Sequence, residues 1–264
     1  MKTALITGAS SGIGETFAQE LAAIKTNLVL VARSEDKLQK LANTLQSKYQ
    51  IQTDVIVQDL TASGATKSLF EAVSQKGLTI DLLVNNAGFG DYGNFAGRLL
   101  EKQVNMIQLN ITALVELTHL FLPGMQQRKS GGIINVASIG GFQPLPYMSV
   151  YGATKAFVLS FSEALWAENQ DSGVKILALC PGPTESDFFQ RAEFPGSGGK
   201  TSMEKLTSAE EVVRDALQAL EKNQSNVVTG GLLNQVIVNT SRFLPRETLA
   251  GVVEKQFKSF DQNK

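Results

Sequence analysis

The sequence predicts a single α/β domain in which helices cover both faces of a doubly wound parallel sheet. Three observations predict this fold. Short apolar runs alternate with longer segments of helical period, the runs are rich in Val, Ile and Leu on both faces, and a glycine-rich turn follows the first run. At 264 residues the chain has the length of one large domain, and no linker or internal repeat divides it.

The expected strands and helices alternate along the chain. Strands are expected at 3–7, 27–32, 51–57, 80–84, 132–137, 174–180 and 227–229. Helices are expected near 12–24, 35–48, 62–76, 98–128, 149–170 and 208–222. The last helix is opened by a capping box formed by Ser208 and Glu211.

Two segments depart from this alternation. Residues 183–207 are too long for an ordinary connection, and they follow a strand's carboxyl end, so we expect a substrate lid. Residues 230–264 form a C-terminal extension with apolar residues at helical spacing. We expect this extension to close the substrate pocket or to pack at an interface. Peripheral contact with a membrane is the alternative, because basic residues flank the apolar ones.

Composition excludes several classes of protein. Lys plus Arg is 24 and Asp plus Glu is 25, so a net charge of −1 gives no attraction to nucleic acid. With Cys180 as the one cysteine, an intrachain disulfide and a thiolate zinc site are excluded, and we expect no metal. No apolar run has the length of a signal peptide core or a membrane span, so a cytoplasmic protein is expected.

The glycine-rich turn predicts a dinucleotide site. Residues 7–14 read Thr-Gly-Ala-Ser-Ser-Gly-Ile-Gly, between the first strand and the first helix. Glycines here permit a tight turn and close approach of the backbone to a pyrophosphate, which the helix N-terminus attracts. A Gly-x-Gly-x-x-Gly match at 88–93 is interpreted as a coincidence in a flexible loop, because no long helix opens there.

The end of the second strand favours NADP(H) over NAD(H). An acidic residue is expected there when the cofactor ribose has a free 2′-OH, but Ala32 and Arg33 occupy the place. The guanidinium of Arg33 suits a 2′-phosphate. The alternative is that Arg33 opens a solvated helix and pairs with Glu35 or Asp36.

Four further residues carry a pattern typical of catalysis. Tyr151 and Lys155 are four residues apart, Ser138 lies thirteen residues before Tyr151, and Asn110 lies twenty-eight before Ser138. Together with the turn at 7–14, Asn-Asn-Ala-Gly at 85–88 and Pro-Gly at 181–182, in this order, the sequence resembles the short-chain dehydrogenase/reductases. The resemblance covers about residues 1–230 and implies a Rossmann-type fold.

The residue types explain the chemistry. A helix places Tyr151 and Lys155 on one face, where the ammonium is expected to favour the phenolate and lower its pKa. Tyr151 would then exchange a proton with a carbonyl or alcohol oxygen, which Ser138 would hold by a hydrogen bond. The resemblance also implies that Lys155 reaches the cofactor ribose and that Asn110 supports a water leading protons to Lys155.

The resemblance implies further cofactor contacts and an oligomer. The contacts are Gly8, Ser10, Ser11, Gly12, Ile13 and Gly14 at the pyrophosphate, Asp59 beside Leu60 at the adenine, Asn86, Ala87 and Gly88 at the adenine ribose, and Pro181, Gly182 and Thr184 at the nicotinamide. Asp59 could equally be a helix cap. Many NADP-preferring members carry a basic residue where Ser11 stands, which leaves Arg33 as the main 2′-phosphate candidate. A homodimer or homotetramer through the helices at 98–128 and 149–170 is expected.

These observations predict an NADP(H)-dependent oxidoreductase that interconverts a carbonyl and an alcohol on an apolar ketone, aldehyde or 3-oxoacyl substrate. An apolar pocket is expected from Phe142, Leu145, Tyr147, Phe188, Phe189 and Phe194. The alternative function is a non-catalytic dinucleotide sensor on the same fold. All four residues of the catalytic pattern are present, and a sensor has no need of all four.

Overall fold

The computed structural model describes residues 2–195, 206–240 and 243–261 of the chain. Residues 196–205, the middle of the expected lid, and residues 241–242 and 262–264 of the extension lie outside the described residues.

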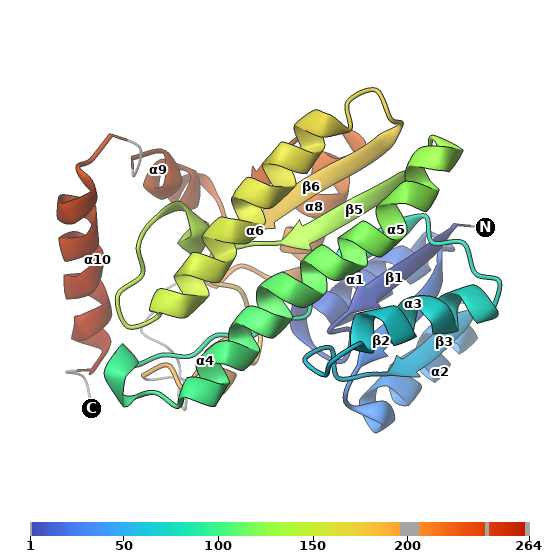
Figure 1. Ribbon diagram of the computed structural model, residues 1–264, viewed down its shortest axis with the longest axis horizontal. Coiled ribbons are helices and arrows are strands. Elements are labelled where there is room, and N and C mark those ends of the chain that lie inside the picture. The colour runs from blue at the N-terminus through green and yellow to red at the C-terminus, as the bar shows by residue number, and fades with distance from the viewer. Residues whose placement is uncertain (1, 196–205, 241–242, 262–264) are drawn as a thin grey trace.

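The described residues form one parallel sheet of seven strands in the order β3-β2-β1-β4-β5-β6-β7 (Figure 1). Each predicted strand is present within two residues of its expected bounds. The strands are β1 (Thr3–Thr7), β2 (Asn27–Ala32), β3 (Thr53–Val57), β4 (Leu82–Asn85), β5 (Gly131–Val136), β6 (Val174–Cys180) and β7 (Asn226–Val228).

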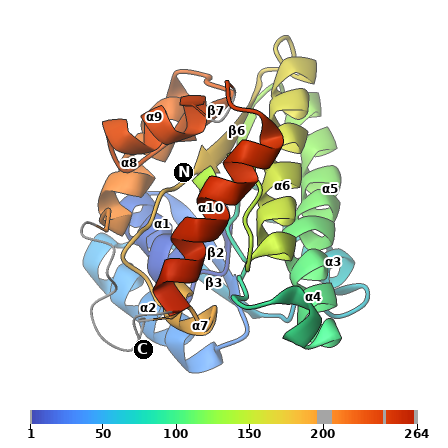
Figure 2. The same cartoon turned by 90° about the vertical axis from the view of Figure 1, so that its left-hand side faces the viewer.

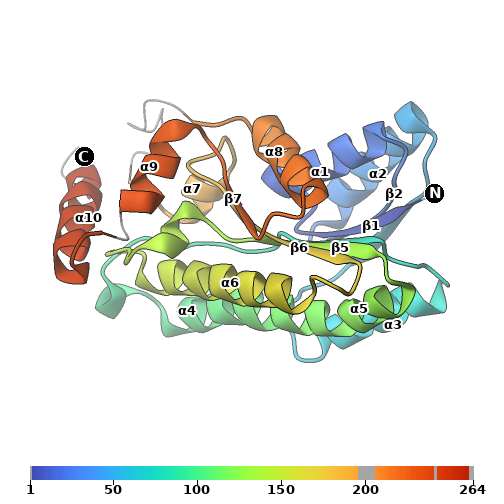
Figure 3. The same ribbon diagram turned by 90° about the horizontal axis from the view of Figure 1, so that it is seen from above.

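Helices connect the strands and cover both faces of the sheet, as expected for a parallel sheet. The helices are α1 (Gly12–Ala23), α2 (Glu35–Tyr49), α3 (Ala65–Gln75), α4 (Leu100–Ile107), α5 (Leu114–Arg128), α6 (Ser149–Glu168), α7 (Phe188–Arg191), α8 (Ala209–Glu221), α9 (Leu232–Thr240) and α10 (Arg246–Asp261). Helices α1, α2 and α8 lie on one face, and α3, α4, α5 and α6 lie on the other (Figure 3).

Strand β1 shows how the sequence builds two cores. Its side chains alternate, so Ile6 packs with Phe17 of α1 on one face, while Leu5 packs with Leu117 of α5 on the other. All four side chains are fully or almost fully buried. A strand buried on both faces has to be apolar at every position, which is the pattern that predicted it.

The carboxyl edge of the sheet gathers the elements that surround the site. Because every strand is parallel, the segments that follow β1, β4, β5 and β6 all emerge there. Helices α7, α9 and α10 lie at this edge, with α10 across it (Figure 2). Leu249 and Val253 of α10 are buried in one cluster with Tyr92 and Phe194. The extension therefore packs on the mouth of the site.

Among the described residues, one helix is long and apolar enough to cross a membrane by length and composition alone. Leu100–Arg128, which comprises α4, a π-helical turn (Gln108–Ala113) and α5, has a mean hydropathy of 1.2 in its most apolar window, and 39% of that window is buried. This helix lies along the sheet and buries Leu117 and Met125 beneath it. That is the arrangement of a core helix, which passes the same test of length and composition.

Candidate functional site

A cavity of about 1200 Å³ opens at the carboxyl edge of the sheet. Its volume exceeds the roughly 300–1000 Å³ of sites that hold one drug-sized ligand, so there is room for a dinucleotide and a second molecule. The glycine turn, Arg33 and Asp59 line one end. Phe188, Phe189 and Phe194 line the other, and Tyr151 and Lys155 also line the cavity.

The glycine turn has the shape that an anion site needs. Gly8 and Gly12 adopt φ of +65° and +56°, and a Cβ on Gly8 would lie 2.8 Å from the Asn86 amide nitrogen. That amide donates hydrogen bonds of 2.9 Å and 3.2 Å to the carbonyl oxygens of Thr7 and Gly8. Ser11 is the N-cap of α1 but forms no side-chain cap hydrogen bond. The turn thus presents the uncapped N-terminus of α1 to the cavity, and these residues fit a pyrophosphate.

The predicted adenosine contacts lie together beside the turn. The Arg33 guanidinium is 75% exposed and lies 3.9 Å from the Asp59 carboxylate, so its ion-pair partner is neither Glu35 nor Asp36. Asp59 accepts hydrogen bonds from the backbone and hydroxyl of Thr61 at 3.0 Å and 2.7 Å. The backbone hydrogen bond is the main reason why the pKa of Asp59 is lowered. Asp59 therefore orders its own turn while it faces the cavity.

The predicted nicotinamide contacts follow β6. Pro181, Gly182 and Thr184 line the cavity, and the Thr184 hydroxyl donates a 2.9 Å hydrogen bond to the Gly182 carbonyl oxygen. Ala87 and Gly88, which follow β4, line the same cavity. The structure thus brings the expected cofactor residues except Gly14 to one cavity, with Leu60 and Ile13 also on its wall. Gly14 packs behind the turn, where a Cβ would lie 2.4 Å from the Gly8 carbonyl oxygen.

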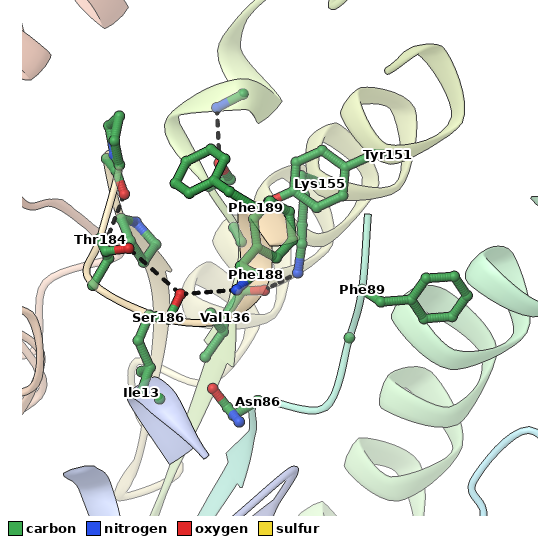
Figure 4. Close-up of a pocket in the computed structure, with 18 of the residues that line it drawn as sticks. Ile13, Asn86, Phe89, Val136, Tyr151, Lys155, Thr184, Ser186, Phe188 and Phe189 are labelled. Carbon is green, nitrogen blue, oxygen red and sulfur yellow. Dashed lines mark hydrogen bonds between the residues drawn. The ribbon is translucent and has the colours of Figure 1, made fainter. Parts of the chain in front are cut away.

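Tyr151, Ser138 and Lys155 meet where the two ends of the cavity join. All three are at least nine-tenths buried. The Lys155 ammonium nitrogen lies 5.8 Å from the centre of the Tyr151 ring, and it donates a 2.6 Å hydrogen bond to the Val136 carbonyl oxygen (Figure 4). Ser138 hydrogen-bonds the Tyr151 side chain. It also accepts a 3.0 Å hydrogen bond from the backbone N–H of Gly140, which holds its hydroxyl in place.

Burial dominates the ionisation of this group. Loss of solvation raises the pKa of Tyr151 to about 12, and the hydrogen bond with Ser138 offsets only part of this rise. Burial also lowers the pKa of Lys155 to about 8. The expectation that the ammonium lowers the pKa of the phenol is therefore wrong for the protein alone. Sequence spacing shows that the two residues share a helix face, but not that both are out of water.

Asn110 lies in the π-helical turn between α4 and α5. Its amide nitrogen donates to the Phe89 carbonyl oxygen at 3.0 Å and to the Thr154 hydroxyl at 3.1 Å, and its oxygen accepts from the Phe89 N–H at 3.1 Å. A Cβ on Gly88 would lie 2.9 Å from the Asn110 oxygen and 3.6 Å from the Lys155 nitrogen. Asn110 therefore holds the loop after β4 against α6, close to Lys155. Its role toward a water stays a prediction.

The loop after β4 is anchored, although the sequence suggested a flexible loop. Asp91 is buried. It accepts a hydrogen bond from Arg98 and another of 2.6 Å from Gln103, and it forms an ion pair of 2.6 Å with Lys102. Glu193, just after α7, pairs with the same Arg98 and Lys102. This network connects the loop, α4 and the end of α7. No local sequence pattern predicts this network, because its members lie up to about a hundred residues apart.

Two further cavity residues escape sequence reasoning. Arg191 ends α7 and reaches the glycine turn, and Asn234 of α9 donates hydrogen bonds of 2.8 Å and 3.1 Å to the carbonyl oxygens of Thr229 and Gly230. Asn234 lies against Gly182, where any Cβ would meet its side-chain nitrogen. An arginine and an asparagine outside any recognised motif carry no signal until the fold brings α7 and α9 to the site.

Comparison with known proteins agrees with this geometry. The family model described as short chain dehydrogenase matches residues 2–194. The very-long-chain 3-oxoacyl-CoA reductase of Rattus norvegicus is 31% identical over 247 residues, which are 92% of this chain and 75% of that protein. The hydroxysteroid dehydrogenase-like protein 1 of Gallus gallus is 35% identical over 182 residues, 67% of this chain and 54% of that protein. The chain thus spans between about half and three quarters of these two relatives.

Solved structures resemble the whole fold. A short-chain dehydrogenase from Sphingobium yanoikuyae in complex with NADPH has a TM-score of 0.82 and 32% identity, and the alignment covers 92% of this chain and 94% of that one. A 7beta-hydroxysteroid dehydrogenase has a TM-score of 0.85 and 28% identity, with 96% of each chain covered. With the glycine turn, the buried tyrosine and lysine and the parallel sheet in place, the chain belongs to the short-chain dehydrogenase/reductase family of oxidoreductases, which act on carbonyl and alcohol groups.

Proposed function

We propose that this protein is an NADP(H)-dependent oxidoreductase that interconverts a carbonyl and an alcohol on a bulky apolar substrate. One observation carries the proposal. The Tyr151 hydroxyl is buried beside Ser138 and Lys155, in a cavity that runs from a glycine turn to an aromatic pocket. A proton donor is thus held between a site that suits a dinucleotide and a site that suits an apolar molecule.

The side chains supply the proton chemistry. With a pKa near 12, Tyr151 is protonated at neutral pH and can donate its proton to a carbonyl oxygen during reduction. Ser138 would hold that oxygen by a hydrogen bond, which fixes it within reach of the phenol. The Lys155 ammonium, on the same helix face, would stabilise the phenolate that remains. When bound, the nicotinamide supplies or accepts the hydride at the substrate carbon.

The proposed preference for NADP(H) depends on Arg33. Its guanidinium is exposed at the edge of the cavity, at the end of β2, where an acidic residue would instead bind a ribose 2′-OH. Related structures were solved with NADPH or with 5-hydroxy-NADP, which supports a nicotinamide dinucleotide in this cavity.

The proposed substrate is suggested by the aromatic end of the cavity. Phe188 packs at 5.2 Å from the Tyr151 ring, and Phe189 and Phe194 continue the wall. Relatives named for very-long-chain 3-oxoacyl-CoA, for bulky ketones and for hydroxysteroids support a large apolar carbonyl compound. Apolar ketones, aldehydes and 3-oxoacyl thioesters are therefore the substrate classes to test.

The test is a titration of the protein with NADPH and with NADH, followed by turnover on a panel of these carbonyl compounds. We expect tighter binding of NADPH and turnover of at least one bulky apolar carbonyl compound. Tighter binding of NADH than of NADPH would overturn the role proposed for Arg33 but would leave the proposed oxidoreductase activity standing. Dinucleotide binding without turnover on any compound would favour a sensor. A cytoplasmic location and peripheral membrane contact by the extension stay predictions.

A further inference from the structure

The short helix α7 brings a positive charge to the glycine turn. The Arg191 guanidinium donates a 3.2 Å hydrogen bond to the Ser11 hydroxyl, although the two residues are 180 positions apart. The same nitrogen lies 3.0 Å from the Asp187 carboxylate, one turn earlier in the chain. Both arginine and serine line the cavity. Arg191 is about half exposed, so its fork of donors remains accessible from the cavity.

The electrostatics of this placement suit an anion. Ser11 is the N-cap of α1, and the positive end of a helix dipole disfavours a nearby cation. The dipole of α1 therefore does not favour Arg191 in this position, where Asp187 is its ion-pair partner. A phosphate between Arg191 and the start of α1 would be attracted by both and would satisfy N–H groups of each.

Helix α7 also contacts the catalytic tyrosine. Phe188, its first residue, packs against the Tyr151 ring, and a Cβ on Gly90 would lie 2.7 Å from the Phe188 ring. Beyond the helix, the Ala192 carbonyl oxygen accepts a 2.8 Å hydrogen bond from the Tyr92 N–H. Helix α7 thus contacts Tyr151 through Phe188 at its start and the glycine turn through Arg191 at its end.

We propose that Arg191 is a cofactor-binding residue that clasps a phosphate of the dinucleotide against the glycine turn and thereby holds Phe188 over Tyr151. The proposal deepens the proposed function and rests on it. In the protein alone, Ser11 and Asp187 are the partners of Arg191. On binding, a phosphate oxygen takes their place, so the cofactor orders the wall of the substrate pocket before the substrate enters. The phosphate comes from the pyrophosphate or from the 2′ position, and both have the chemistry that a guanidinium recognises.

The experiment measures dinucleotide affinity directly, without turnover. Nucleotide fluorescence or calorimetry gives the Kd of NADPH and of NADH for the wild type, Arg191→Met, Arg191→Lys and Arg246→Met. Arg246, exposed at the start of α10, is the matched control for loss of a surface arginine. We expect Arg191→Met to weaken NADPH binding about tenfold at low salt, with partial rescue by lysine and no change in the control. Asp187→Asn removes the competing carboxylate and should tighten binding.

The two nucleotides identify the phosphate. An equal loss for NADPH and NADH assigns Arg191 to the pyrophosphate, and a loss for NADPH alone assigns it to the 2′-phosphate. Unchanged Kd values for both nucleotides in a folded Arg191→Met, checked by circular dichroism and thermal melting, would overturn the inference and leave the proposed function intact. Failure of the wild type to bind either nucleotide would instead refute the proposed function.

A substrate measurement tests the second half of the proposal. If Arg191 holds α7 over Tyr151, then Arg191→Met should raise the KM of a bulky carbonyl substrate at saturating NADPH, while Arg246→Met should not. An unchanged KM would show that the phosphate contact does not position Phe188.

Discussion

The Lys155 ammonium nitrogen donates a hydrogen bond of 2.6 Å to the carbonyl oxygen of Val136, the last residue of β5. This contact ties α6, which carries Tyr151, to the strand whose end carries Ser138. Burial of the ammonium lowers the pKa of Lys155 to about 8, although the carbonyl oxygen accepts its hydrogen bond. The proton on Lys155 is therefore exchangeable near physiological pH, next to the tyrosine that is proposed to donate one.

Replacement of Tyr151 by Phe should separate binding from chemistry. The variant keeps the ring against Phe188 but loses the proton donor, so we expect turnover to fall by about 10²–10⁴-fold with little change in the Kd of NADPH. Steady-state rates and nucleotide titration check both quantities. Turnover close to that of the wild type would refute Tyr151 as the acid–base group.

Lys155 should make stability depend on pH. Between pH 8 and 10.5 the unfolded chain keeps a proton on Lys155 that the folded protein has lost, so the free energy of unfolding should rise with pH across this window. A shift from 10.5 to about 8 corresponds to about 3 kcal/mol. Denaturant unfolding of the wild type and of Lys155→Met, at pH 7 and pH 10, isolates this contribution. A constant difference between the two proteins would contradict the lowered pKa.

Arg33 should decide between the two nucleotides. Arg33→Ala removes the cation at the end of β2 and should weaken NADPH binding about 10- to 100-fold, with NADH binding unchanged. Asp59→Asn removes the ion-pair partner 3.9 Å away and should have a small effect in the opposite direction. Equal losses for both nucleotides in Arg33→Ala would show that Arg33 does not read the 2′-phosphate.

Asp91 should contribute strongly to stability. Burial alone would raise the pKa of Asp91, but hydrogen bonds and charges from Arg98 and Lys102 outweigh it, and the pKa is lowered. Asp91→Ala leaves these two cations without their buried partner, which should cost about 2–3 kcal/mol in the free energy of unfolding. Glu193→Gln is the control, since Glu193 binds the same cations but is largely exposed, and it should cost less than about 1 kcal/mol.

The expected oligomer would use the outer face of α4 and α6. Leu100, Val104 and Ile107 of α4 are exposed, as is Phe157 of α6, so the two helices present apolar side chains to solvent. We propose that this face is covered by a second copy of the chain, and we expect Val104→Glu to shift the protein toward the monomer in analytical ultracentrifugation. Leu232→Glu, at an exposed position of α9, should leave the oligomer unchanged. A wild type that is monomeric at micromolar concentration would contradict the proposal.

The order of strands and helices could be predicted from the sequence because it depends on neighbours in the chain. Buried strands such as β1 and β6 are apolar on both faces, and their predicted bounds agree with the structure. The helix at 98–128 was predicted as one element, but its π-helical turn at Asn110 was not. A change in helical hydrogen bonding leaves no apolar pattern of its own.

The sequence by itself determined the family, the fold and many of the residues at the cavity, since these depend on local spacing and on ordered motifs. Only the tertiary structure decided how those residues behave. It shows that burial raises the pKa of Tyr151, that a buried Asp91 anchors the loop after β4, and that Arg191 lies against Ser11. Each of these depends on solvent exclusion or on contacts between segments far apart in the chain. Such contacts are set by packing, and spacing along the chain does not encode them locally.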